Sequence, residues 1–251
     1  MLSSAGLPIH PISCGWLTTD ASTMITGQTG DFRMPVPAFL VEHPHGLVLF
    51  DTGMHPDVAH STDKLHGLES MFTPELAPDG SVGPQLRAAG FDPADVAFIV
   101  SSHLHFDHCG GHVEVPNARL LVQRPEWDAG HNARLIEFGV YDPADFDIGH
   151  DVELLDGDHD IFGDGTLRAV VTPGHTSGHQ SLVIEGKTIL VGDACYCRLA
   201  LDLDALPSYS YDGDRQRETF TWLREQEAGG AELVFSHDLA QWESLTTTTS
   251  P

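Results

Sequence analysis

Basic residues are scarce in this chain. Its 251 residues include 12 Lys and Arg against 37 Asp and Glu, which gives a formal net charge of −25 with histidine neutral. Proteins bind nucleic acids mainly through Lys and Arg, which neutralise phosphates and release their counterions into solution. Anionic membrane surfaces attract the same residues. The composition therefore argues against nucleic-acid and membrane partners, and we expect a small-molecule substrate.

Long hydrophobic runs are also missing. No apolar stretch approaches the ~20 residues that a membrane span needs, and the first residues lack the basic and then hydrophobic order of a signal peptide. The four cysteines, at positions 14, 109, 195 and 197, form no CxxC pair, and a chain of this length does not need disulfides. We expect buried free thiols in a soluble, cytoplasmic protein that is a monomer or a homodimer.

Short apolar runs rich in Val, Ile, Leu and Phe end in polar or glycine-rich turns, which is typical of buried strands. The predicted strands are Val36–Val41, Leu47–Phe50, Val96–Val100, Leu120–Val122, Leu167–Val171, Ser181–Ile184, Thr188–Val191 and Leu233–Phe235. Helices are predicted at Gly83–Ala89 and at Asp214–Ala228, the second with Asp214 as its cap. We expect sheets covered by helices in one domain over residues 1–245, with a flexible tail at 246–251.

The segment His55–Pro84 is rich in Pro, Gly, His and Asp, with scattered apolar residues. Loops of this length are usually functional lids or disordered. Two interpretations stay open: a lid over a site, or an excursion of the chain that carries a short helix.

Histidine is abundant, with 16 residues, and it is the commonest metal ligand. Five predicted strands are each followed by His or Asp; these are Asp51, the run His103–His108, His175, Asp193 and His237. Ligands of open α/β sheets bind at the carboxyl ends of strands, so we expect these side chains to meet there. We interpret ten other histidines as structural: His10, His43, His45, His55, His60, His66, His112, His131, His150 and His159.

The spacing within the run His103–His108 suits metal binding. Residues two apart in an extended chain project to the same side, so His103 and His105 can hold one ion together. Asp107 and His108 are adjacent, and we expect the following glycines to turn them toward the same pocket. Burying three imidazoles and a carboxylate within six residues would be costly without a metal or other partners.

When His175, Asp193 and His237 are added, the number of candidate ligands exceeds the four that one tetrahedral ion requires. The set comprises His103, His105, Asp107, His108, His175, Asp193 and His237. Seven ligands imply two metal ions, and Asp193 is the natural bridge because a carboxylate has two oxygens. The nitrogen and oxygen donors suit Zn²⁺ and would also accept Mn, Fe or Co. His179 is expected to support the loop or a ligand rather than to bind metal.

The chain resembles the metallo-β-lactamase superfamily, and within it the N-acyl-homoserine-lactone lactonases that quench quorum signalling. The resemblance runs from Val36–Gly53 to Val234–Asp238, and its narrower part rests on Asp51–Met54, Thr172–His179 and Asp193–Tyr196. It implies an αββα sandwich (α/β) of two mixed β-sheets flanked by helices.

The resemblance also implies a role for each matching residue. His103, His105 and His175 would hold one metal, Asp107, His108 and His237 the other, and Asp193 both. Asp51 would orient a ligand histidine, and Tyr196 would face the substrate carbonyl. The implied activity is a hydrolase that opens the lactone ring of N-acyl-homoserine lactones by attack of a metal-bridging hydroxide, with Asp107 passing a proton to the leaving oxygen.

The acyl chain of such a substrate needs an apolar wall, for which Met24, Leu65, Leu68, Met71 and Phe72 are the candidates. Other functions stay open at this stage. The main alternative is a thioester hydrolase of glyoxalase II type, or another lactonase or esterase of the same superfamily. An oxidoreductase of the flavo-diiron kind and a metal-dependent binding module are the others.

Overall fold

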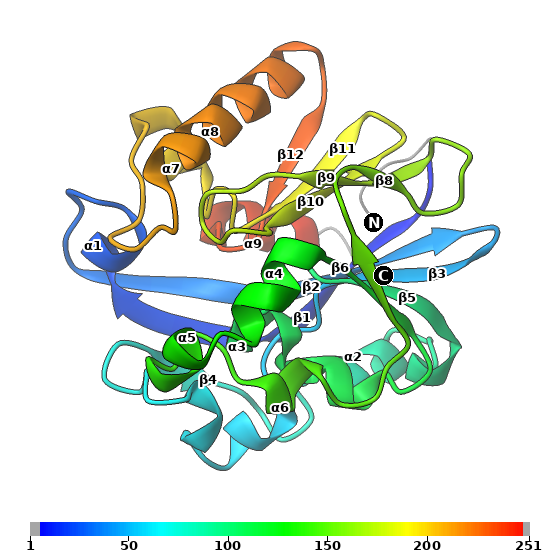
Figure 1. The fold of residues 1–251 in the computed structure, drawn as a ribbon, viewed down its shortest axis with the longest axis horizontal. Helices are drawn as coiled ribbons and strands as arrows, with labels where there is room; N and C mark the ends of the chain where they lie inside the picture. Colours follow the sequence, from blue (N-terminus) through cyan, green and yellow to red (C-terminus); the bar gives the residue numbers. More distant parts are fainter. Residues whose placement is uncertain (1–5, 248–251) are drawn as a thin grey trace.

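Two β-sheets packed face to face form the centre of the structure, a computed structural model in which residues 6–247 are described (Figure 1). Within these residues one sheet has the strand order β4-β1-β2-β3-β5-β6-β7 and the other has the order β12-β11-β10-β9-β8. The first sheet consists of β1 (Ile9–Asp20), β2 (Asp31–His43), β3 (Gly46–Phe50), β4 (Thr73–Glu75), β5 (Val96–Val100), β6 (Arg119–Gln123) and β7 (Val152–Leu155). The second consists of β8 (His159–Asp160), β9 (Leu167–Val171), β10 (Gln180–Ile184), β11 (Thr188–Gly192) and β12 (Glu232–Phe235).

Helices cover the outer faces of both sheets. The α-helices are α1 (Ala21–Met24), α2 (Val82–Ala88), α3 (Phe106–Cys109), α4 (Arg124–Gly130), α5 (Ala133–Glu137), α6 (Pro143–Phe146), α7 (Arg198–Leu203), α8 (Gly213–Ala228) and α9 (Leu239–Thr247). The 3-10 turns are η1 (Pro56–Ala59), η2 (Asp63–Leu65), η3 (Pro93–Asp95) and η4 (Gly110–Glu114). Figure 1 shows α7 and α8, in orange, beyond the second sheet, and α2 on the opposite side of the molecule.

Strand β2 shows how the layers are built. Alternate side chains of a strand point to opposite faces of its sheet. Phe39 and Val41 accordingly join the core between the two sheets, whereas Ala38 and Leu40 join the core beneath the outer helices. Both sheets mix antiparallel and parallel pairs. The predicted αββα sandwich of two mixed sheets is therefore confirmed.

Strand direction brings the candidate ligands to one side of the sandwich. Strands β3 and β5 run parallel in the first sheet, and β11 and β12 run parallel in the second. Strand β9 has the same direction as β11, because both pair antiparallel with β10. The loops that follow these five strands thus come from two sheets, not from the edge of a single open sheet as the sequence suggested.

Several elements differ from the sequence prediction. Strand β1 was not predicted, because Pro11 and Gly15 interrupt its apolar pattern. In the structure its pairing with β2 shifts register between Ser13 and Trp16. Asp214 is not the cap of α8; that residue is Asp212, whose side chain accepts the N–H groups of residues 214 and 215. Of the predicted tail, residues 246 and 247 complete α9, and residues 248–251 lie outside the described part of the chain.

The segment His55–Pro84 has short elements of its own: η1, η2, the strand β4, which pairs with β1, and the start of α2 at Val82. Lys64 Nζ lies 2.7 Å from Asp145 Oδ1, and His66 Nε2 lies 2.7 Å from Asp145 Oδ2. Asp145 is itself buried. These contacts attach this segment to helix α6.

The four cysteines are free and buried, as predicted. Burial raises the pKa of the Cys109 and Cys195 thiols well above the usual value, so they stay protonated. No helix among the described residues is long and apolar enough to cross a bilayer.

Candidate metal centre

Three histidines from two loops form the first group of candidate ligands. His103 and His105 follow β5, and His175 follows β9. His103 Nε2 lies 2.9 Å from His105 Nδ1, and His175 Nε2 lies 3.1 Å from the same nitrogen. The three ring nitrogens therefore face one small volume, as the ligands of a single cation do.

The second group combines a carboxylate with two histidines. His108 Nε2 lies 3.7 Å from Asp107 Oδ2, and His237 Nε2, from the loop after β12, lies 3.9 Å from the same oxygen. Asp107 and His108 sit on the short helix α3. The helix turns these two residues toward the site. The expected role of glycine conformation is wrong, because Gly110 has an ordinary helical φ of −58°. The glycine is needed because a Cβ there would lie 2.3 Å from the backbone nitrogen of His55.

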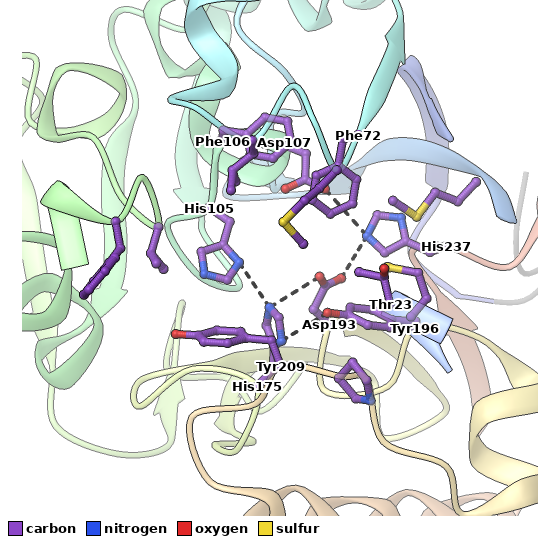
Figure 2. Close-up of a pocket in the computed structure, with 17 residues that line it drawn as sticks. Thr23, Phe72, His105, Phe106, Asp107, His175, Asp193, Tyr196, Tyr209 and His237 are labelled. Carbon is purple, nitrogen blue, oxygen red and sulfur yellow. Dashed lines mark hydrogen bonds and ion pairs between the residues drawn. The ribbon is translucent and has the colours of Figure 1, made fainter. Parts of the chain in front are cut away.

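Asp193, directly after β11, lies between the two groups. Its Oδ1 is 3.3 Å from His108 Nε2 and 3.1 Å from His237 Nε2. Its Oδ2 is 3.6 Å from His175 Nε2 and 3.9 Å from His103 Nε2. Figure 2 shows this carboxylate between the imidazoles of His175 and His237. The structure thus brings all seven predicted ligand residues together, with one oxygen of Asp193 facing each group.

Unpaired polar atoms show that the centre suits cations. His108 Nε2, His237 Nε2 and Asp193 Oδ1 are buried and have no hydrogen-bond partner. A buried polar group without a partner costs free energy, and these three atoms face one another at the middle of the site. A divalent cation accepts lone pairs from imidazole and carboxylate together. The donor set therefore fits a metal ion.

Groups behind the ligands orient them. His108 Nδ1 donates to Asp51 Oδ2 at 2.8 Å, and His237 Nδ1 donates to the Pro35 carbonyl at 2.8 Å. A proton held at Nδ1 leaves the Nε2 lone pair free to face the centre. Asp51 also accepts the backbone N–H and the hydroxyl of Ser102, at 2.7 and 2.8 Å, so its carboxylate fixes the start of the ligand loop.

His179 supports Asp193 and is not among the ligands. Its Nε2 accepts the backbone N–H of Asp193 at 2.9 Å, and its Nδ1 bonds the Thr172 hydroxyl at 2.9 Å. Burial lowers the pKa of His179 to about 3, so the ring is neutral near pH 7 and can accept this bond. It fixes the position at which Asp193 enters the site.

The two groups differ in their electrostatics. Burial lowers the pKa of His103 and His175 well below the usual value and that of His105 to about 4, so this group is neutral. Burial also opposes charge on His108 and His237, but the carboxylates of Asp193 and Asp107 outweigh it and raise both pKa values. The second group therefore attracts positive charge more strongly than the first.

An apolar cavity of about 370 Å³ opens above the candidate ligands. Four of the five predicted wall residues line it: Met24, Leu68, Met71 and Phe72. The prediction is wrong for Leu65, which is fully buried in the hydrophobic core. Sequence reasoning missed further lining residues, namely Thr23, Met34, Phe106, Phe138, Val140, Pro207 and Tyr209. Phe138 is 63% exposed, and no periodic pattern in the sequence marks it.

Tyr196 lines the same cavity beside the candidate ligands. Its hydroxyl lies 3.3 Å from His175 Nδ1, and Figure 2 shows the phenol close to Asp193. Burial raises the pKa of this phenol well above its usual value. Tyr196 therefore stays protonated and can donate a hydrogen bond to a molecule in the cavity.

A family model described as the metallo-beta-lactamase superfamily matches residues 32–237, more than half of the chain. The chain belongs to the metallo-β-lactamase superfamily. It is 36% identical over 236 residues to the N-acyl homoserine lactonase AttM of Azorhizobium caulinodans, a match that covers 88% of this chain and 89% of that relative. The resemblance stated from the sequence motifs is therefore confirmed.

Two further similarities extend to the Bacillus enzymes and to a solved structure. The N-acyl homoserine lactonase AiiA of Bacillus thuringiensis subsp. kurstaki is 29% identical over 220 residues, with 84% of each chain covered. A solved N-acyl homoserine lactone hydrolase, with N-hexanoyl-L-homoserine bound at its catalytic metal centre, is 28% identical. It superimposes with a TM-score of 0.82 over 94% of this chain and 95% of that one.

A histidine beside the site makes folding stability depend on pH. His112 is fully buried, its Nε2 lies 2.9 Å from Ser101 Oγ, and its Nδ1 has no partner. Burial lowers its pKa from 6.5 to about 3. Because the folded-state pKa lies below the unfolded one, the stability that this group contributes is present above pH 6.5 and is lost as the pH falls toward 3.

We expect His112→Asn to make the stability of chelator-treated protein less dependent on pH below 6.5. The change in slope should approach about 1.4 kcal/mol per pH unit, the value for one proton. Urea unfolding of wild type and variant at pH 6.5 and 5 measures it. Equal slopes for the two proteins would contradict the assignment.

Proposed function

We propose that this chain is a metal-dependent lactonase that opens the ring of N-acyl-homoserine lactones. The observation that carries the proposal is the place of Asp193, between two ligand groups at the floor of an apolar cavity. The relatives named N-acyl homoserine lactonase, and the solved structure that holds an acyl-homoserine product, support this substrate class. The cavity suits a substrate with one polar end and one apolar chain.

The proposal includes two divalent ions, most simply Zn²⁺, with Mn, Fe or Co also compatible with the donors. One would be held by His103, His105 and His175, and the other by Asp107, His108 and His237, with Asp193 shared. When bound, such a pair lowers the pKa of water toward 7 and polarises a carbonyl oxygen. The cytoplasmic location and the monomeric or homodimeric state stay predictions from the sequence.

Two residues of the chain act directly on the substrate in this proposal. Hydrolysis places the hydroxyl of water on the carbonyl carbon and its proton on the ring oxygen, while the bond between that carbon and that oxygen breaks. The Tyr196 phenol donates to the carbonyl oxygen as negative charge develops there. Asp107, which lines the cavity, holds the proton of the attacking water and passes it to the ring oxygen.

The cavity walls favour a lactone over a thioester of glutathione. Among the described residues that line the cavity, none is Lys or Arg. Glutathione carries carboxylates that a binding site would pair with such cations. An acyl-homoserine lactone is neutral and needs no cationic partner. A thioester hydrolase of glyoxalase II type is the alternative function, and comparing hydrolysis rates on a lactone and on an acyl-glutathione distinguishes the two.

The proposed activity requires two bound ions and a preference for lactones. We expect two equivalents of metal per chain in active protein, loss of hydrolysis after chelation, and recovery when Zn²⁺ is restored. Rates on N-hexanoyl-homoserine lactone should exceed those on an acyl-glutathione, a β-lactam and a phosphoester. Elemental analysis and this substrate panel test the proposal, and full activity with fewer than two ions would overturn it.

Removing the Tyr196 hydroxyl tests its proposed role as a donor. Tyr196→Phe should lower kcat on lactones by about ten- to a thousandfold, the usual effect of losing one donor to a developing oxyanion. Metal content should stay at the wild-type level. Tyr211→Phe is the matched control, because this residue is 62% exposed and is not among the residues that line the cavity. Equal turnover in the two variants would remove Tyr196 from the reaction.

The apolar wall is tested by shortening one of its side chains. Phe72→Ala removes a ring that lines the cavity, so the ratio of kcat/KM for decanoyl over butanoyl substrates should change by about tenfold, the worth of 1 to 2 kcal/mol of lost apolar contact. Phe91→Ala makes the same truncation away from the cavity and should leave the ratio unchanged. A ratio unaffected in both variants would contradict the proposed acyl site.

A further inference from the structure

We propose that Glu126 is a positioning residue that holds His103, His105 and His175 in the arrangement that binds one metal ion. The inference rests on the proposed two-metal function and adds a residue to it. Glu126 lies on helix α4, is fully buried, and belongs to neither ligand group. It was not among the residues that the sequence motifs singled out.

Four hydrogen bonds end on the Glu126 carboxylate. Oε1 accepts the backbone N–H of Leu104 at 3.1 Å and the Tyr141 hydroxyl at 2.9 Å. Oε2 accepts the Thr176 hydroxyl at 2.6 Å and the backbone N–H of Gly178 at 3.1 Å. Each oxygen therefore has one backbone donor and one side-chain donor.

Three of these four donors, all except Tyr141, belong to the segments that carry the first ligand group. Leu104 separates His103 from His105, and Thr176 directly follows His175. The Tyr141 ring lies 5.3 Å from the His105 ring, centroid to centroid. One carboxylate thus connects the loop after β5 to the loop after β9, whose ligands His105 and His175 are 70 residues apart along the chain.

The contact between α4 and the second loop is tight. A Cβ at Gly178 would lie 2.2 Å from the backbone nitrogen of Glu126, so only glycine allows this approach. The Ser177 hydroxyl also donates to the Pro125 carbonyl at 3.0 Å. The loop that carries His175 is therefore attached to the first turn of α4 by hydrogen bonds to both Pro125 and Glu126.

The free-energy cost of burying the Glu126 carboxylate explains why it can hold the two loops in place. Among the described residues, Glu126 forms no ion pair with Lys, Arg or His within 4 Å, so neutral donors alone solvate its charge. A buried carboxylate is costly unless its oxygens are hydrogen-bonded. Moving either loop away would leave the charge under-solvated, and this cost keeps both loops in place.

The second ligand group depends on different anchors. His108 is oriented by Asp51, and His237 by the Pro35 carbonyl. Neither of these contacts involves Glu126. The inference therefore predicts a selective effect: loss of the Glu126 carboxylate should weaken one of the two metal ions and leave the other bound.

Glu126→Gln tests this prediction with the least change in shape. A glutamine amide presents one oxygen and one NH₂ group, so one backbone N–H, of Leu104 or of Gly178, would face a donor that cannot accept. We expect one of the two Zn²⁺ ions to bind about ten- to a hundredfold more weakly, as is usual for residues that orient metal ligands. Retention of Zn²⁺ against a graded series of chelator concentrations measures both affinities.

Two ligand deletions identify which ion is affected. In the background of His237→Ala, the tighter remaining ion is at the first group, and adding Glu126→Gln should weaken it. In the background of His175→Ala, the remaining ion is at the second group, and the same change should leave its affinity within about twofold. Equal weakening in both backgrounds, or in neither, would overturn the inference.

Control variants separate positioning from general stability. Glu114 is a half-buried carboxylate that accepts the backbone N–H of Gly83 at 2.8 Å, so Glu114→Gln should retain both ions. If Glu126→Gln does not fold, Thr176→Val removes a single donor and should weaken the same ion by a smaller factor. A loss of thermal stability with both Zn²⁺ affinities unchanged would contradict the inference. Wild-type protein with fewer than two ions would instead contradict the proposed function.

Discussion

The carboxylate of Asp193 is the element on which the rest of the site depends. Each of its oxygens faces a different group of histidines, and its position is set by the N–H···N bond from its own backbone to His179. Negative charge at this point makes it favourable to gather so many imidazole nitrogens in one buried volume. Without the Asp193 carboxylate, protonation of any of these buried histidines would place an uncompensated positive charge in the site, and this charge would repel a metal cation.

The sandwich supports this arrangement by placing ligand loops from two sheets at one side. Two buried acids lie behind the ligands: Asp51 accepts hydrogen bonds from His108 and Ser102, and Glu126 accepts them from Leu104 and Thr176, next to His103 and His175. Both acids contact ligand segments through several hydrogen bonds, so the ligand geometry is fixed by the core of the protein. The apolar walls of the cavity above come partly from regular elements, such as Met34 of β2, and partly from irregular segments, such as the one with Leu68, Met71 and Phe72.

Much of the site was predictable because its motifs are local. The spacing from His103 to His108 indicates metal binding by itself, and the strand-then-ligand order pointed to His175, Asp193 and His237. The apolar wall was less accessible: Leu65 was predicted there and lies in the core. An apolar residue in an irregular segment has no periodicity that says which way its side chain points, so the lining at Phe138 went unnoticed for the same reason.

The sequence by itself determined the class of chemistry, since histidine and aspartate at this spacing have few uses other than holding divalent cations. It also determined the layered α/β architecture, through apolar runs that end at ligand residues. Only the tertiary structure decided which residues share a contact across the chain. Glu126 is the clearest case: nothing near it in the sequence marks it, and its role arises from donors at positions 104, 141, 176 and 178 that only the packing of α4 against two loops brings to one carboxylate.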